Sequence, residues 1–390
     1  MTSQTIAFET RANIKVLFAL TLVHFTGDFY SSFITPLFPL FVDRLGLSLA
    51  QVGIVAGIGR LLAFIVQPSV GYLADRYPNR FFILGGLLLS VVFVPMSGIA
   101  PGFWTLLLIV AVGSLGSSMF HPSTTGMVPV YSGLNSGLAM SVFNTGGTLA
   151  FAVGPLFITW YAARFGLNAL PFTMGFGLVV AGYLYTVVPA PESEGLQSRG
   201  FIGSIRESLG SAWKIVAGIW LVMFLRAVVG QSFLTFMPVM YVEKGFSVVS
   251  AGVIFSLFSV AGVFSGLLSG HIADRIGFKP VFVFTHLLMA PVLFLLLRME
   301  GGFVYPGAVL AGGFVLASLP VGVVMAQKLA PRGRSMVASL MMGFAYGLGG
   351  AVTPIVGKLA DIYSIHAVLT GVCLIPLLTL PVILRFPRIR

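Results

Sequence analysis

The sequence predicts an all-α integral membrane protein with twelve transmembrane helices in two pseudo-symmetric bundles of six. Composition is the first observation: 57% of the 390 residues are hydrophobic, only 8% are charged, and the mean hydropathy is +1.01. Soluble domains carry about 25% charged residues, so this chain could not cover a water-exposed surface. The other two observations are a series of long apolar runs and an internal repeat. Low charge argues against a soluble enzyme or a disordered chain, and a lone Cys373 argues against a disulfide scaffold.

Breaks in hydropathy divide the chain into twelve apolar runs, each able to supply the roughly 20 residues that a transmembrane helix needs. The first run follows Glu9, Arg11 and Lys15 and continues to Phe41. It is too long for the apolar core of a signal peptide, so we expect it to be retained as the first helix. The first six spans are predicted near residues 15–41, 50–72, 80–100, 103–130, 134–162 and 168–188. The second six are predicted near residues 214–242, 248–270, 279–298, 303–328, 334–357 and 364–386.

A polar segment separates the two sets of spans. Residues 1–188 form the predicted N-terminal bundle, 189–212 a cytoplasmic linker and 213–390 the C-terminal bundle. If both termini are cytoplasmic, fifteen of the 22 Lys and Arg residues lie on the inner side, five on the outer side and two, Arg60 and Arg226, inside spans. Basic residues concentrate in cytoplasmic loops, so this bias predicts cytoplasmic termini. It also explains the net charge of +11 without nucleic-acid binding.

The two halves share a repeated motif at the end of their second spans. Residues 71–76 read GYLADR, and residues 270–275 read GHIADR, 199 positions later. Pro155 and Pro354 are separated by the same 199 positions. Parallel repeats of this kind are typical of secondary transporters whose substrate site lies between the halves.

These motifs, at these places in a twelve-span chain, resemble the signature loops of the major facilitator superfamily. The first copy continues to Arg80, with Pro78 where the family usually has glycine. The resemblance implies the major facilitator fold, a monomer, and loops that help to close the cytoplasmic side. We therefore expect a gating role for Gly71, Asp75, Arg76, Arg80, Gly270, Asp274, Arg275 and Lys279. The alternative is that these charges only orient the helices in the membrane.

Four motifs narrow the resemblance to the fosmidomycin-resistance type of efflux transporter. They are HFTGD at 24–28, PLFP at 36–39, QPSVG at 67–71 and FHP at 120–122. The resemblance implies proton-driven export (antiport) of small, often anionic drugs or metabolites across a bacterial inner membrane. The expected partners are a small-molecule substrate, protons and membrane lipids, with the proton gradient as energy source and no cofactor.

Asp28 is the only carboxylate predicted inside a span, and an intramembrane charge is a functional candidate because its burial is costly. His24 lies four residues earlier, on the same helix face. Such a pair can take up and release a proton, so we predict Asp28 as the proton carrier and His24 as its modulator. The alternative is a structural ion pair between Asp28 and an arginine that locks two helices together.

Arg60 and Arg226 lie in the middle of spans and outnumber the single intramembrane carboxylate. One positive charge is therefore unbalanced within the protein, and it suits an anionic substrate. We predict substrate contacts at Arg60, Arg226, His121, Gln67, Asn144 and Gln231. The alternative is that an arginine extends to the membrane interface or binds backbone carbonyls.

The fourth and fifth spans carry polar and glycine-rich faces. The polar face of the fourth span contains Ser114, Ser117, Ser118, His121 and Thr125. In the family that the chain resembles, the fourth helix lines the central cavity, so the resemblance implies that this face is a cavity wall in which His121 contacts the substrate or a proton. The alternative is hydrogen bonding between helices, which Ser and Thr do routinely in membranes. In the fifth span, Gly154 and Pro155 predict a hinge and packing face with a role in gating.

Other function classes find little support. The sequence shows no evident nucleophile–base pair, Walker motif or metal-ligand cluster, so we expect neither an enzyme nor a metal site. Uptake of an organic anion, with the two arginines as carboxylate clamps, is the competing transport hypothesis. A non-transporting membrane sensor or lipid-handling protein is the alternative from another class, and it predicts that Asp28 or the loop motifs are dispensable.

Overall fold

The structure, a computed structural model, confirms an all-helical membrane protein. It describes residues 12–76, 80–133, 136–189, 212–330, 337 and 340–389, without the side chains of 68, 71–76, 136, 137 and 342. Within these ranges every regular element is a helix, and eleven helical segments are long and apolar enough to cross a membrane. The eleventh predicted span, near 334–357, and the predicted linker lie partly outside these ranges.

The N-terminal half contains predicted spans one to six. The first span is interrupted near Pro36 and Pro39, because proline lacks the N–H that a continuous helix needs. It comprises α1 (Ile14–Ser31), the 3₁₀ turn η1 (Thr35–Leu37) and α2 (Phe38–Leu45). The other elements are α3 (Leu49–Arg76), the π-helical turn η2 (Phe81–Gly85), α4 (Gly86–Met96), η3 (Ser97–Ile99), α5 (Phe103–Tyr131), α6 (Ser136–Phe165), η4 (Leu167–Thr173) and α7 (Met174–Val187).

The C-terminal half contains the later spans. Its last predicted span is divided in two just before Pro376, again because proline cannot donate within a helix. The elements are α9 (Trp213–Glu243), α10 (Val248–Ile276), α11 (Phe278–Arg298), η6 (Gly301–Phe303), α12 (Val304–Leu329), the π-helical turn η8 (Leu340–Phe344), α14 (Ala345–Ala351), α15 (Thr353–Tyr363), α16 (Ile365–Val372) and α17 (Ile375–Ile383).

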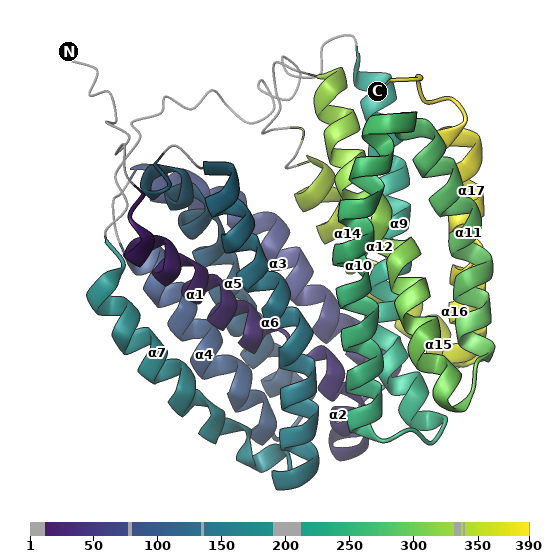
Figure 1. Cartoon of the computed structure of the whole chain (residues 1–390). Coiled ribbons are helices and arrows are strands. Elements are labelled where there is room, and N and C mark those ends of the chain that lie inside the picture. The colour runs from purple at the N-terminus through teal and green to yellow at the C-terminus, as the bar shows by residue number, and fades with distance from the viewer. Residues whose placement is uncertain are drawn as a thin grey trace.

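The helices of each half gather in a bundle of their own, and the two bundles stand side by side (Figure 1). The start of α1 and the end of α17 lie at one end of the molecule, and α2 and α15 lie toward the opposite end, here called the distal end. Between the bundles, α3 contacts α14 and α15, and α6 contacts α10. One buried apolar cluster, which includes Phe33 and Phe236, runs through both halves.

Small residues let α3 and α15 approach closely near the distal end. A Cβ on Gly53 would collide with the backbone of Thr353, and a Cβ on Gly357 would collide with the backbone of Leu49. The Thr353 hydroxyl also donates to the Gly53 carbonyl at 2.8 Å. The halves are therefore joined tightly here, in the way that small residues allow between membrane helices.

Candidate functional site

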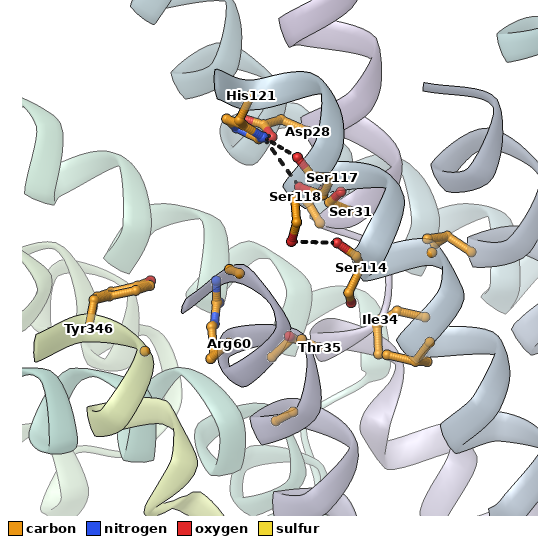
Figure 2. Close-up of a pocket in the computed structure, with 18 of the residues that line it drawn as sticks. Asp28, Ser31, Ile34, Thr35, Arg60, Ser114, Ser117, Ser118, His121 and Tyr346 are labelled. Carbon is orange, nitrogen blue, oxygen red and sulfur yellow. Dashed lines mark hydrogen bonds and ion pairs between the residues drawn. The ribbon is translucent and has the colours of Figure 1, made fainter. Parts of the chain in front are cut away.

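A cavity of about 360 Å³ lies between the two halves (Figure 2). Helices α1, α3 and α5 supply most of its wall, and η8 and α14 close it from the C-terminal half. The polar side chains in the wall are Asp28, Ser31, Ser32, Thr35, Arg60, Gln67, Ser114, Ser117, Ser118, His121 and Tyr346. The polar face predicted for the fourth span therefore lies in the wall, apart from Thr125.

Asp28 is the buried centre of a group of three titratable side chains, here called the His–Asp–His cluster (His24, Asp28 and His121), in which His24 is buried and His121 is half-buried. Asp28 Oδ2 lies 3.2 Å from His24 Nε2, and Asp28 Oδ1 lies 3.2 Å from His121 Nε2. His24 is one turn before Asp28 on α1, whereas His121 comes from α5. Asp28 is only 4% exposed. Among the described residues it pairs with two histidines and with no arginine, unlike the alternative of an Asp28–Arg ion pair.

Backbone carbonyls fix the orientation of both imidazole rings. His24 Nδ1 lies 3.0 Å from the carbonyl oxygen of Phe143, and His121 Nδ1 lies 2.8 Å from that of Ser117. The Ser117 hydroxyl is also near His121 Nδ1, but at 3.4 Å it is much farther away than the carbonyl oxygen. A carbonyl oxygen only accepts hydrogen bonds, so each Nδ1 carries a hydrogen and donates it. Nε2 is therefore the ring nitrogen that each histidine presents to Asp28.

Two aromatic rings and one glycine shape the space around the cluster. The His24 ring stacks on Phe143 with 4.2 Å between centroids, and the His121 ring stacks on Phe120 with 4.4 Å. A Cβ at Gly147 of α6 would lie 2.5 Å from His24 Nε2 and 2.7 Å from Asp28 Oδ2. Only glycine leaves room for the His24–Asp28 contact at this point.

The cluster also brings together atoms of the type that bind transition metals, within 4.8 Å of one another. The sequence indicates no such group because His121 is remote from Asp28 in the chain. Protons alone can occupy both imidazole–carboxylate contacts, so the geometry does not require a metal ion.

Arg60 faces the cavity from α3 and contacts groups of the other half. Its guanidinium carbon lies 5.1 Å from the centroid of the Tyr346 ring, within cation–π range (Figure 2). The stem of Arg60 packs against Gly350, where a Cβ would lie 2.5 Å from its Cγ. No carboxylate of the described part of the chain forms an ion pair with Arg60. Its charge is therefore available to an anion in the cavity.

Arg226 lies away from this cavity, inside the C-terminal half. It is 2% exposed, and its Nη1 donates to the Val315 carbonyl at 3.2 Å. Its Nε has no hydrogen-bond partner among the described residues. Arg226 interacts electrostatically with Tyr346, whose side chain lies in the cavity wall. Gln231, another predicted substrate contact, is also buried and outside the wall, and its Nε2 has no partner among those residues.

The other predicted substrate and hinge residues divide between the cavity and its surroundings. Gln67 lies in the wall, whereas Asn144 is exposed on α6 and outside the wall. Gly154 packs α6 onto α1, where a Cβ would collide with Ser32. The carbonyl of Pro155 accepts a hydrogen bond from the Thr159 hydroxyl at 2.7 Å. The fifth predicted span thus contributes packing, not polar contacts, to this cavity.

The gating motifs are partly described. Arg80 Nη1 donates to the Tyr185 carbonyl at 3.2 Å, and Lys279 Nζ donates to the Leu384 carbonyl at 2.5 Å. Each basic residue therefore binds a helix end of its own half. Near the end of α10 lie Gly270 and the exposed Asp274 and Arg275. For Gly71, Asp75 and Arg76 the structure describes only the backbone, so the contacts predicted for them lie outside what it describes.

Asp361, near the distal end of α15, is a functional candidate that sequence reasoning missed. Its carboxylate accepts hydrogen bonds from the backbone N–H groups of Leu49 (2.7 Å) and Ala50 (3.0 Å), where α3 begins. These first N–H groups lack partners within α3 and carry the positive end of its dipole, so a carboxylate from the other half stabilises them. Asp361 opposes the dipole of its own helix, and that mismatch is the one sequence feature that indicates a partner elsewhere.

Comparisons with known proteins agree with the fold and the motifs. The family model for the Major Facilitator Superfamily matches residues 18–354 and 219–389. The fosmidomycin resistance protein of Escherichia coli (strain K12) is 28% identical over 381 residues, which cover 95% of this chain and 92% of that protein. The multidrug resistance protein MdtG of Citrobacter koseri is 27% identical over 67% of each chain.

A solved structure shares the fold. It is a bacterial homologue of the human lysosomal transporter Spinster, in an inward-facing and occupied conformation, with a TM-score of 0.81 and 16% identity over 95% of both chains. The family model matches nearly the whole chain, and its members transport small molecules across membranes instead of catalysing reactions. This chain therefore belongs to the Major Facilitator Superfamily of membrane transporters.

Proposed function

We propose that this protein is a proton-coupled secondary transporter that exports small anionic or amphiphilic compounds by antiport. The observation that carries the proposal is the His–Asp–His cluster, a buried titratable group that opens into the cavity between the halves beside Arg60. The names of the relatives, a fosmidomycin resistance protein and a multidrug resistance protein, support export of drug-like molecules.

Asp28 and His24 carry the proton in this proposal. A buried carboxylate is stabilised by a positively charged neighbour, and an imidazole becomes positive when it takes up a proton. Proton binding therefore changes the net charge of the polar side chains that line this small cavity. The proton gradient supplies the energy, and no cofactor takes part.

Arg60 provides the fixed positive charge for an anionic group of the substrate, and Gln67 and the serines of α5 supply hydrogen bonds. We assign this role to Arg60 in preference to Arg226, because only Arg60 lies in the cavity wall. Tyr346, whose ring faces the Arg60 guanidinium, brings the C-terminal half into the same site.

Alternating access follows from rocking of the halves about this site. The Asp361 contact with α3 holds the distal end closed, and the charged loop motifs close the opposite end in turn. In this proposal the protein acts as a monomer in a bacterial inner membrane, with both termini cytoplasmic.

Drug accumulation in an efflux-deficient bacterium tests the proposal. Cells expressing wild type or Asp28→Asn are compared with empty-vector cells, using fosmidomycin and several cationic drugs, with and without an uncoupler. We expect the wild type to lower accumulation of at least one compound, and we expect the uncoupler to abolish the effect. Asp28→Asn should accumulate drug to the empty-vector level, because the amide cannot carry the proton.

Asp43→Asn is the matched control, because Asp43 is exposed on α2 and does not line the cavity. It should export like the wild type. Normal export by Asp28→Asn at equal membrane abundance would contradict the proton-carrier role. Exclusion of no compound by a wild-type protein that reaches the membrane would refute drug export for this panel.

Proton-coupled uptake of an organic anion is the second candidate. One observation favours it: the protonatable cluster and Arg60 line the same cavity, so protons and an anion bound there attract each other. Uptake of labelled organic anions into proteoliposomes, driven by an inward proton gradient, separates this candidate from export.

A further inference from the structure

The His–Asp–His cluster has a proton requirement that follows from the orientation of its rings. Both histidines donate through Nδ1 to backbone carbonyls, at 3.0 Å for His24 and 2.8 Å for His121. In a neutral imidazole the other nitrogen, Nε2, then carries a lone pair and no hydrogen. Each Nε2 nevertheless lies 3.2 Å from a carboxylate oxygen of Asp28, which also carries only lone pairs when ionised. Without further protons, each contact therefore places a lone pair of Nε2 against a lone pair of a carboxylate oxygen, with no hydrogen between them.

One added proton can satisfy one of these contacts but not the other. The two histidines reach different oxygens of the carboxylate, Oδ2 for His24 and Oδ1 for His121. We propose that the His–Asp–His cluster binds two protons, one in each imidazole–carboxylate contact, and that an anion in the adjoining cavity is bound preferentially by the doubly protonated form. The part concerning the anion rests on the proposed function of the cavity as a substrate site.

The surroundings leave these two protons to the cluster alone. On α1, the Tyr30 hydroxyl donates to the Thr173 carbonyl instead of facing Asp28. Helix α6 meets the cluster with the Phe143 carbonyl and Gly147. Its nearest described titratable side chain, Tyr161, is fourteen residues further on, about 21 Å along the helix.

The remaining helices near the cluster add fixed or distant groups. Helix α4 contains no titratable residue, and the tyrosines of α7, Tyr183 and Tyr185, are exposed. Across the cavity, α3 contributes Arg60, whose charge is constant, and α14 contributes Tyr346, whose ring faces it. The cluster is thus the part of this wall whose charge changes with protonation.

Charge counting gives the sign of the coupling. With both protons bound, two imidazolium ions and one carboxylate leave a net charge of plus one, whereas with both released the net charge is minus one. An anion beside Arg60 is therefore attracted by the protonated cluster and repelled by the empty one, so anion and protons bind together. A cationic amphiphile is attracted by the deprotonated cluster and therefore exchanges with protons. This sign narrows the proposed function: antiport is assigned to cationic amphiphiles, and an anion is assigned to proton co-transport, as in the second candidate function.

Nitrogen NMR of the unliganded protein tests the proton count. Protein labelled with ¹⁵N-histidine is placed in lipid nanodiscs with a chelator, and spectra of His24→Gln and His121→Gln assign the resonances. We expect both histidines to become imidazolium over the same pH range. His286 is the internal control, because its Nδ1 lies 3.0 Å from the Phe282 carbonyl while its Nε2 has no partner among the described residues. It should remain neutral over that range.

The result that overturns the proton count is a wild-type spectrum in which one of the two histidines keeps a bare Nε2 while the other is imidazolium. In Asp28→Asn, the imidazolium signals of both histidines should be lost at neutral pH, since the carboxylate that stabilises them is gone. If this variant does not fold, the wild-type comparison with His286 still decides the question.

Proton uptake on ligand binding tests the sign. Fosmidomycin, whose phosphonate is anionic, is added to the purified protein in weak buffer with a pH indicator at alkaline pH. The wild type should take up protons, approaching two per bound drug, and His121→Gln should take up at most one. Release of protons on binding would overturn the predicted sign. Absence of fosmidomycin binding would exclude fosmidomycin as a substrate, while the NMR result still decides the proton count.

Discussion

His121 in the N-terminal half and His286 in the C-terminal half are fixed in the same way but face different surroundings. Each ring presents Nδ1 to the carbonyl four residues earlier, at 2.8 Å for His121 and 3.0 Å for His286. His121 then meets the carboxylate of Asp28, whereas His286 is fully buried and its Nε2 has no partner among the described residues. The two histidines therefore differ in what their Nε2 atoms meet, a carboxylate for His121 and no described partner for His286, and not in how their rings are held.

The charged groups of the two halves differ in the same sense. The N-terminal half buries a carboxylate with two imidazoles, and every member of that group can gain or lose a proton. The C-terminal half buries Arg226, whose charge is permanent and whose one described hydrogen bond goes to a backbone carbonyl. In the proposed function, the N-terminal half therefore responds to protons and the C-terminal half keeps a constant charge.

Filling the space beside the His–Asp–His cluster is the strongest test of this comparison after Asp28→Asn. In Gly147→Ala, the new Cβ would lie 2.5 Å from His24 Nε2 and 2.7 Å from Asp28 Oδ2, so the contact must open. Overpacking of this kind costs about 1–3 kcal/mol, so we expect export to fall by about tenfold or more. Initial export rates from preloaded cells measure the effect. Gly182→Ala, where the Cβ meets nothing within 4 Å, is the control, and equal export by both variants would contradict the prediction.

Removing the cation of the cavity wall has the next largest effect. Arg60→Met keeps a long stem but loses the charge, and hydrogen bonds to charged groups contribute about 1.5–3 kcal/mol. Fosmidomycin binding to the purified protein should therefore weaken by about 10- to 100-fold, whereas binding of an uncharged substrate should change little. Calorimetric titration measures both affinities. A similar loss for charged and uncharged ligands would indicate a structural role for Arg60.

The distal contact of Asp361 should show a smaller effect. Asp361→Asn weakens two hydrogen bonds to the start of α3, and a carboxylate at a helix N-terminus is worth about 0.3–1 kcal/mol. We expect the population with an open distal end to rise by about two- to fivefold. Distances between spin labels on the two halves near this end measure the shift. Lys358→Gln, which changes an exposed charge on the same helix, should leave the distances unchanged.

Replacement of Arg226 should have the smallest effect on transport. Arg226→Met exchanges a buried cation for an apolar side chain of similar length, and such exchanges are often neutral or stabilising. Export should stay within about twofold of the wild type, and the unfolding temperature should be equal or higher. Thermal unfolding in nanodiscs and the accumulation assay measure the two quantities. Loss of export in a stably folded Arg226→Met variant would contradict this prediction and indicate that the anion binds at Arg226 in the C-terminal half.

Local features of the sequence predicted the helices and the central residue of the site. The apolar runs predict twelve spans whose described parts agree with the structure within several residues, except where the first, the eleventh and the last are interrupted next to prolines. Asp28 was singled out because it is the one carboxylate inside a predicted span. Contacts between segments that are distant in the chain could not be predicted from the sequence. The sequence gives no reason to place His121 beside Asp28 or to distinguish Arg60 from Arg226, and it does not indicate which group Asp361 contacts.

Composition and periodicity along the chain are enough to predict the membrane class, the repeat of two halves and the polar residues whose burial in a membrane is costly. Those properties depend on composition and short-range periodicity, which hydrophobic transfer converts directly into membrane helices. The tertiary structure decided that Asp28 meets two histidines and not an arginine, that Arg60 faces the cavity while Arg226 does not, and that Asp361 stabilises α3. Those outcomes depend on how the helices pack, because a polar group inside a membrane is stabilised by whichever partner the neighbouring helix brings within hydrogen-bond distance.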